Sequence, residues 1–123
     1  MGIADFRELT ADISRNLTPL RAGQSEVMKA FGALSRAAMA PGALDAKTKE
    51  LIALAIGVAQ RCDGCIGFHT KALVQMGTTE AELQEMLAVA VYMGGGPSLM
   101  YAANTLAAFQ QFSAQAASTG TAV

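Results

Sequence analysis

The chain has 123 residues, the length of one ordinary domain, and its 52% hydrophobic residues suffice for a core without disulfide bonds or metal ions. A formal net charge of −1 with no basic run gives no support to nucleic-acid binding. The longest apolar run, residues 51–59, is too short to span a bilayer, and the first fourteen residues lack a secretory h-region. We therefore expect a cytoplasmic protein that does not bind a membrane.

Helical periodicity dominates the sequence, and sustained strand patterns are almost absent. Apolar residues at three- and four-residue steps predict amphipathic helices over about residues 3–16 and 24–40. The first stripe consists of Ile3, Phe6, Leu9, Ile13 and Leu17, and the second of Val27, Phe31, Leu34 and Ala38. Pro41 and Gly42 interrupt this pattern, and Asp45 is the expected N-cap of the next helix.

That third helix, about residues 45–60, is apolar on nearly all sides after its first turn, so we expect it to be central. A fourth helix over about residues 63–76 ends at Gly77, which suits the left-handed position after a helix. Thr79 and Glu82 have the spacing of a capping box and open a fifth helix.

The segment GGGP at residues 94–97 lacks a phosphate-loop lysine and a preceding strand, so it predicts a helix break. Pro97 suits the first turn of a sixth helix, whose expected face is Leu99, Ala103, Leu106 and Phe109 or Gln110. Residues 114–123 lose large apolar side chains and predict a flexible tail. The prediction is an all-α single domain, residues 1–123, of about six helices with short connections.

Both cysteines and the only histidine lie within eight positions: Cys62, Cys65 and His69. A helix that starts near Asp63 places the cysteines at its first turn, where free N–H groups and the helix dipole stabilise a thiolate. Asp63 would be the capping acid, and Gly64 leaves room beside the sulfurs. Cys65 and His69 are four residues apart on one helix face, so the imidazole can approach the sulfur.

Three readings of this cluster remain open on local grounds. Two cysteines can pack as small apolar residues, because free cysteine is often buried. Cys62, Cys65 and His69 can also bind zinc, although the chain offers no further Cys or His as the fourth ligand. A redox pair is favoured by the spacing at a helix start and by the reducing cytosol, where structural disulfides are rare. Haem attachment requires a histidine directly after the second cysteine, which is absent.

Glu50 lies twelve residues before Cys62, on the helix face that also contains Gly57. A glycine there permits the next helix to come close. The Glu50 carboxylate can then hold His69 or act as a base itself, whereas the alternative is an ordinary exposed glutamate.

Taken together, Glu50, Cys62, Cys65 and His69 match in full the pattern E-x(11)-C-x-x-C-x-x-x-H. This pattern resembles the signature of the alkylhydroperoxidase D-like group of the carboxymuconolactone decarboxylase superfamily. The resemblance covers about residues 25–112, where helices, glycine turn and capping box follow the order of the family.

The resemblance implies an all-helical fold that assembles as homotrimers or as homohexamers built from dimers. It implies that Cys62 and Cys65 are a redox pair and that Glu50 and His69 relay protons. Gly64 is a departure, since well-known peroxidase members often carry a second histidine at this position. The decarboxylase branch is not favoured, because it does not use this cysteine pair.

We therefore expect a thiol-dependent peroxidase or disulfide reductase in which the thiolate of Cys65 reacts and Cys62 forms the disulfide with it. No dissociable cofactor is needed, and electrons arrive from a thioredoxin-like or lipoyl-bearing partner. The alternative is a redox- or zinc-responsive binding subunit without turnover.

Overall fold

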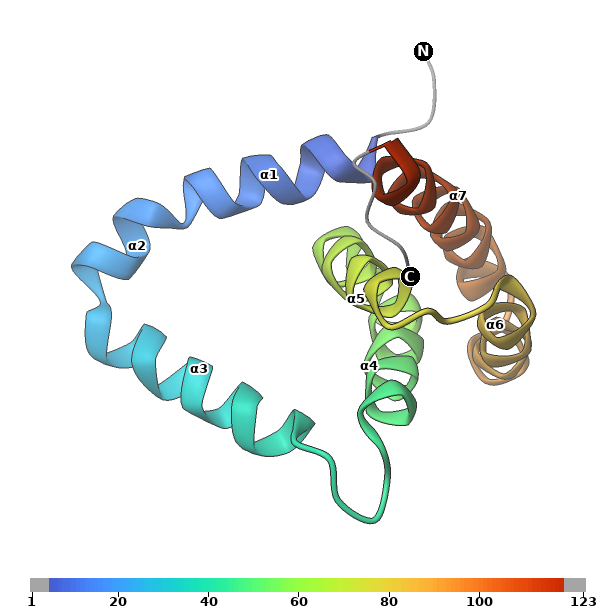
Figure 1. The fold of residues 1–123 in the computed structure, drawn as a ribbon, viewed down its shortest axis with the longest axis horizontal. Helices are drawn as coiled ribbons and strands as arrows, with labels where there is room; N and C mark the ends of the chain where they lie inside the picture. The colour runs from blue at the N-terminus through green and yellow to red at the C-terminus, as the bar shows by residue number, and fades with distance from the viewer. Residues whose placement is uncertain (1–4, 119–123) are drawn as a thin grey trace.

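The computed structural model describes residues 5–118, which form seven α-helices and no strand (Figure 1). In chain order these are α1 (Phe6–Asn16), α2 (Thr18–Gly23), α3 (Ser25–Met39), α4 (Ala46–Ala59), α5 (Asp63–Gln75), α6 (Glu80–Gly94) and α7 (Gly96–Ser118). The all-α, single-domain prediction is confirmed, with one helix more than the six expected. The extra helix, α2, begins at Thr18 and Pro19, because proline cannot continue α1 but fits a first turn.

The core lies among α4, α5, α6 and α7, with α1 packed across α5 and α7 (Figure 1). Its fully buried side chains include Leu54 and Val58 of α4, Ile66 and Leu73 of α5, and Leu83 of α6. Helix α4 contacts each of the other three core helices, so its predicted central position is confirmed. One side of α4 is nevertheless uncovered, because Ile52 and Ile56 are about half exposed.

Three predicted helix boundaries are confirmed by their capping contacts. The Asp45 carboxylate accepts a hydrogen bond from the Thr48 backbone N–H. Thr79 and Glu82 form both halves of a capping box at the start of α6. Gly77 follows α5 with φ of 76°, the left-handed conformation that glycine adopts without steric cost.

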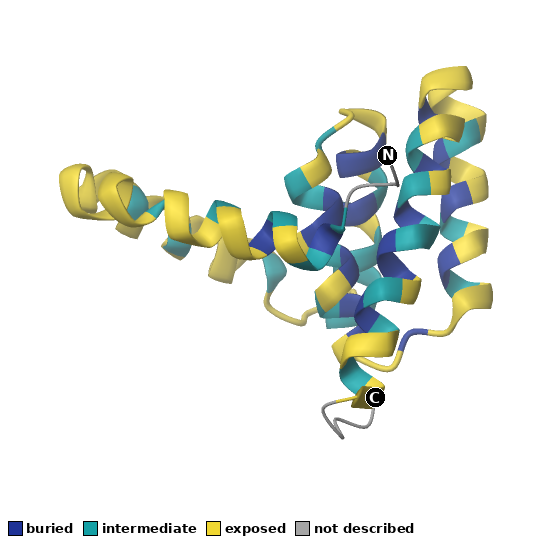
Figure 2. Cartoon of the chain, turned by 90° about the horizontal axis from the view of Figure 1, so that it is seen from above, coloured by how far each residue is buried: buried dark blue, intermediate teal, exposed yellow. Residues whose placement is uncertain are grey.

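The helix predicted over residues 24–40 exists as α3, but its apolar stripe is not buried. Helices α2 and α3 together form an arm, Thr18–Met39, that projects from the helical core and contains no buried residue (Figure 2). The stripe of α1 does pack: Phe6 is buried and Leu9 lies against the core, while Ile3 falls outside the described residues.

Helix α7 differs in part from its prediction in which face is buried. The predicted Phe109 is buried and the predicted Leu106 packs against the core, but Leu99 is half exposed, and the inner face instead contains Ser98, Ala102 and Thr105. The helix also continues past Ala114 to Ser118, inside the predicted flexible tail; residues 119–123 lie outside the described part of the chain. Within residues 5–118, no helix is both long enough and apolar enough to cross a membrane.

Candidate redox site

The turn between α4 and α5 sets the position of the cysteine pair. Helix α4 ends in a Schellman motif: the Cys62 N–H donates to the Gly57 carbonyl at 3.0 Å, and the Arg61 N–H donates to the Val58 carbonyl at 3.1 Å. Arg61 occupies the left-handed position with φ of 58°, where glycine is the usual residue. The chain therefore turns sharply after α4, and Cys62 lies directly at the start of α5.

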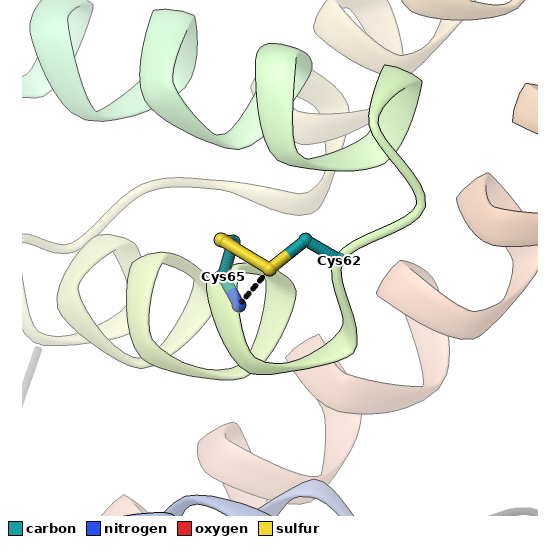
Figure 3. The surroundings of a disulfide bond; sticks show 2 residues. All are labelled: Cys62 and Cys65. Atoms are coloured by element: carbon teal, nitrogen blue, oxygen red, sulfur yellow. Dashed lines mark hydrogen bonds between the residues drawn. A yellow bond between two sulfur atoms is a disulfide. The ribbon is translucent and has the colours of Figure 1, made fainter.

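Cys62 is the N-cap of α5, and it is bonded to Cys65 by a disulfide with 5.2 Å between the Cα atoms (Figure 3). The Cys62 Sγ also accepts a hydrogen bond from the Cys65 backbone N–H at 3.2 Å (Figure 3). The sequence had assigned the cap to Asp63, and this is wrong, because the sulfur takes the place of the usual capping oxygen and Asp63 is the first helical residue. One of the free N–H groups of the helix is thus directed at the Cys62 sulfur.

Gly57 permits the close approach of α4 to the second cysteine. A Cβ atom at position 57 would lie 3.0 Å from the Cβ of Cys65, inside the normal contact distance. Gly57 itself is buried, so any larger side chain would push Cys65 and the start of α5 away. The prediction that a glycine at this position lets the next helix come close is confirmed.

Glu50 and His69 form the second half of the site. The His69 Nδ1 lies 2.7 Å from the Glu50 Oε2, and this contact joins α4 to α5. The Glu50 side chain is only 13% exposed and that of His69 is 32% exposed, so the pair is largely shielded from water. With Nδ1 protonated and donating to the carboxylate, the imidazole keeps Nε2 as a proton acceptor. The reading of Glu50 as an ordinary exposed glutamate is therefore wrong.

The opposite side of α5 faces α1. A Cβ at Gly64 would lie 3.0 Å from the Ile13 Cδ1, and one at Gly67 would lie 2.6 Å from the Thr10 Cγ2. Two glycines three residues apart thus let α1 lie directly against the first turns of α5. A histidine at position 64 would have to displace Ile13, which gives a packing reason for the glycine found there.

No three His, Cys, Asp or Glu side chains between residues 5 and 118 are grouped in a way that could hold a metal ion. The two cysteines are bonded to each other, and His69 is engaged by Glu50. The zinc reading of the cluster therefore gains no support from the arrangement.

The structure brings the four predicted residues into two contacts, the Cys62–Cys65 bond and the Glu50–His69 pair. Sequence reasoning did not identify Thr10 and Ile13 as neighbours of this turn. Ile13 belongs to the predicted stripe of α1, and Gly64 and Gly67 are three residues apart on α5, but nothing in the local sequence pairs one helix with the other.

Comparison with known proteins identifies the relatives of the chain. Residues 25–108 match the carboxymuconolactone decarboxylase family. An uncharacterized protein from Cupriavidus necator is 39% identical over 110 residues, which are 89% of this chain and 97% of that protein. Uncharacterized protein 4 in the cox locus of Paracoccus denitrificans is 38% identical over 91 residues, covering 74% of this chain and 81% of its own length.

Two solved structures share the fold. The apo form of a carboxymuconolactone decarboxylase family protein from Legionella pneumophila is 55% identical, with a TM-score of 0.86 over 88% of this chain and 96% of that one. A family protein from Thermotoga maritima, for which an involvement in antioxidative response has been suggested, is 28% identical with a TM-score of 0.79, covering 92% and 96%. The chain therefore belongs to the carboxymuconolactone decarboxylase family, as the resemblance of its Glu, Cys and His pattern predicted.

Proposed function

We propose that the protein is a thiol-dependent peroxidase or disulfide reductase that uses Cys62 and Cys65 as its redox pair. The observation that carries the proposal is a disulfide at the N-terminus of α5 that is followed, one turn after Cys65 on the same helix, by His69, which is held by Glu50 of α4. A thiolate needs a positive environment and a proton acceptor to be reactive at neutral pH. The first turn of α5 supplies the positive environment, and His69 is the proton acceptor.

In the oxidative half-reaction, the Cys65 thiolate attacks one peroxide oxygen and the O–O bond breaks. The departing oxygen takes a proton and leaves as an alcohol or water, while Cys65 becomes a sulfenic acid. The Cys62 thiol then attacks this sulfur, so that the disulfide forms and water leaves. One peroxide gains two electrons, and the two thiols lose them.

His69 is the group that moves the proton in this scheme. It lies one helical turn after Cys65, takes the thiol proton on Nε2 and returns it to the departing oxygen. Glu50 is a positioning residue, because it holds Nδ1 and thereby fixes the orientation and tautomer of the ring.

In the reductive half-reaction, a dithiol donor opens the Cys62–Cys65 bond through a mixed disulfide and is itself oxidised. A thioredoxin-like or lipoyl-bearing protein has the required chemistry, and no dissociable cofactor takes part. We place this cycle in the reducing cytosol and in a homo-oligomer, a trimer or a hexamer. The suggested antioxidative involvement of the Thermotoga maritima relative agrees with this proposal.

The competing function is a redox-responsive binding subunit, in which the same disulfide changes assembly without turnover. The exposed apolar residues of the arm favour this alternative, because such a surface is typical of interaction sites. The test therefore includes it.

Stopped-flow oxidation of the reduced protein by cumene hydroperoxide, combined with thiol counting, separates the two functions. We expect two thiols lost per peroxide, a rate far above that of free cysteine, and loss of that rate in Cys65→Ser. Met93→Leu removes a highly exposed methionine and is the control for sulfoxide formation. A wild-type rate equal to that of free cysteine would exclude the peroxidase and leave disulfide reduction, measured with a lipoyl or thioredoxin donor. Absence of turnover in both assays would leave the binding subunit.

A further inference from the structure

The two sulfurs of the Cys62–Cys65 bond have different surroundings. Cys62 is the N-cap of α5, and its Sγ accepts the hydrogen bond from the Cys65 backbone N–H at 3.2 Å (Figure 3). Within residues 5–118, no hydrogen-bond donor is directed at the Cys65 Sγ. An N–H group at a helix N-terminus stabilises negative charge on the atom that it faces, so the two sulfurs are not equivalent as thiolates.

The position of Cys62 at the cap does not depend on the disulfide. Its backbone N–H donates to the Gly57 carbonyl at 3.0 Å, and its own carbonyl accepts from the Ile66 N–H at 2.9 Å. These two bonds tie Cys62 to the end of α4 and to the first turn of α5. When the S–S bond opens, the Cys62 sulfur therefore stays beside the N–H of Cys65.

The Glu50–His69 pair lies on the side of the other sulfur. His69 follows Cys65 by one helical turn, so the two side chains share one face of α5. While the imidazole is neutral, its pair with the Glu50 carboxylate has one negative charge, which disfavours a thiolate on Cys65. Lys71, the one lysine or arginine of α5, is exposed and lies further along the helix. Negative charge is thus more stable on Cys62 than on Cys65.

The other charged groups around this turn do not reverse the difference. Arg61 and Asp63 flank Cys62 in the sequence, are both exposed and have opposite charges. Where α1 packs against α5, Asp12 and Arg15 form an ion pair with each other. Helix α7 contains no charged residue, and both lysines of α4 lie in the first turn of that helix, at the end opposite the cysteine turn.

We propose that Cys62 is the sulfur that leaves as a thiolate when a donor opens the disulfide, so that the donor becomes joined to Cys65. Of two sulfurs in a disulfide, the one whose thiolate is more stable leaves faster, and the attacking thiol bonds to the other. The inference rests on the disulfide reduction of the proposed function and names the sulfur at which that reduction begins.

The step places attack and proton transfer at the same end of the pair. A donor thiol gives its proton to the His69 Nε2 and attacks the Cys65 Sγ, while the electron pair of the S–S bond goes to Cys62. The second donor thiol then attacks the donor sulfur of the mixed disulfide and releases its proton to water. Cys65 leaves and takes the proton from His69. The donor loses two electrons, and the pair ends as a Cys62 thiolate and a Cys65 thiol, which is the proton that His69 removes when peroxide arrives.

Locating a mixed disulfide tests the assignment directly. The oxidised full-length chain is mixed with excess glutathione, quenched in acid and digested with pepsin. Peptides that contain both cysteines and one glutathione are then fragmented in the mass spectrometer. We expect most of the glutathione on Cys65 and a free thiol on Cys62. Arg61→Gln and Asp63→Asn change the flanking charge in opposite directions, and both should leave this distribution unchanged, because the N–H of Cys65 determines it.

Alkylation of the reduced chain is the second readout. Iodoacetamide is applied across a range of pH, and each cysteine is followed separately by mass. We expect Cys62 to reach its half-maximal rate at a lower pH than Cys65. The pH midpoint of a thiol reports its own ionisation, so a difference in exposure between the two sulfurs does not produce this result.

Four results would overturn the proposal. These are glutathione mainly on Cys62 or equally on both sulfurs, a lower pH midpoint for Cys65, a redistribution of glutathione in Arg61→Gln or Asp63→Asn, and a disulfide that forms no glutathione adduct. Peroxide enters neither readout. A chain that gives the expected adduct and midpoints but reacts with peroxide no faster than free cysteine would keep this assignment and lose the peroxidase activity of the proposed function.

Discussion

His69 on α5 and Glu50 on α4 are nineteen residues apart in sequence and meet at 2.7 Å between Nδ1 and Oε2. The contact ties the helix that bears the histidine to the central helix of the core. The turn that carries Cys62 also connects the end of α4 to the start of α5. The histidine and the cysteine pair thus both lie on α5, and α4 holds this helix at Glu50 and at the turn.

Glu50→Gln tests whether this carboxylate positions His69. Glutamine keeps the size and an acceptor oxygen but loses the charge that favours the ring as a proton carrier. We expect thiol oxidation by peroxide to slow by up to about 100-fold, the low end of what a proton-transfer group contributes. The pH–rate profile should also change shape. Stopped flow over the pH range of roughly 5 to 9 measures it, because imidazole changes charge between about pH 5 and 8.

The matched control is Glu80→Gln, which changes an exposed glutamate of α6 that accepts a hydrogen bond from the Gln84 side chain. A uniform slowing of Glu50→Gln at every pH, with the profile unchanged, would indicate a structural role for Glu50 and contradict the relay.

Gly67→Ala tests the contact between α1 and α5. The added Cβ would lie 2.6 Å from the Thr10 Cγ2 on a buried surface, so α1 has to shift. Overpacking of this kind costs about 1–3 kcal/mol, offset by about 1 kcal/mol of helix propensity. We expect a lower urea midpoint, and Thr10→Ser, which removes only the clashing methyl group, should restore most of it.

Gly32→Ala is the control for the propensity effect, since its Cβ meets only the end of the flexible Arg36 side chain. It should be neutral or stabilising. Equal effects of Gly67→Ala with and without Thr10→Ser would show that the two helices do not press together here.

Local signals predicted most of this fold correctly. The caps at Asp45 and Thr79 and the left-handed Gly77 involve residues within four positions, so their chemistry is readable in sequence. The candidate site residues Cys62, Cys65 and His69 were also identifiable, because a Cys-x-x-Cys pair with a histidine one turn later is a short-range pattern. Glu50 was a candidate from its place on the helix face of Gly57, but the sequence left open whether it holds His69 or is exposed, because only packing brings the two together.

The sequence-based predictions were wrong where contacts between helices decide which residues are buried. Helix α7 has apolar residues on two faces, and periodicity alone chose the face of Leu99 over the face of Ala102 that the core buries. The stripe of α3 predicted a helix correctly but did not indicate that the chain itself leaves Phe31 uncovered. The sulfur cap of Cys62 was missed because capping preferences favour oxygen side chains such as that of Asp63.

Lys47→Met tests the ion pair between α4 and α6 and its pH dependence. The Lys47 Nζ lies 2.7 Å from the Glu82 Oε2, and this bond holds the pKa of Glu82 below its ordinary 4.5 and raises the pKa of Lys47 above 10.5. Because the pKa of Glu82 is lowered in the folded protein, the pair stabilises the fold above pH 4.5, and this stabilisation is lost as the pH falls through the lowered pKa. Because the pKa of Lys47 is raised, its stabilisation is present below pH 10.5 and is lost as the pH rises through the raised pKa.

We therefore expect Lys47→Met to lower the melting temperature by a small amount at pH 7, because both partners are more than a third exposed. The difference from wild type should vanish in acid as Glu82 is protonated. Lys29→Met, which removes a much more exposed pair with Glu26, is the control and should have less effect. A difference that stays constant down to pH 2 would assign the effect to side-chain packing instead.

Arg61→Gly tests the backbone strain in the turn that delivers Cys62. A left-handed conformation costs a residue with a side chain roughly 1–2 kcal/mol, and Arg61 has φ of 58° with an exposed side chain. Glycine loses more freedom on folding, so the net gain should be up to about 1 kcal/mol, measured by urea unfolding of the oxidised protein. Gly77→Ala at the equivalent position after α5 should have the opposite sign. If Arg61→Gly instead destabilises the protein, the arginine side chain contributes more to this turn than its backbone conformation costs.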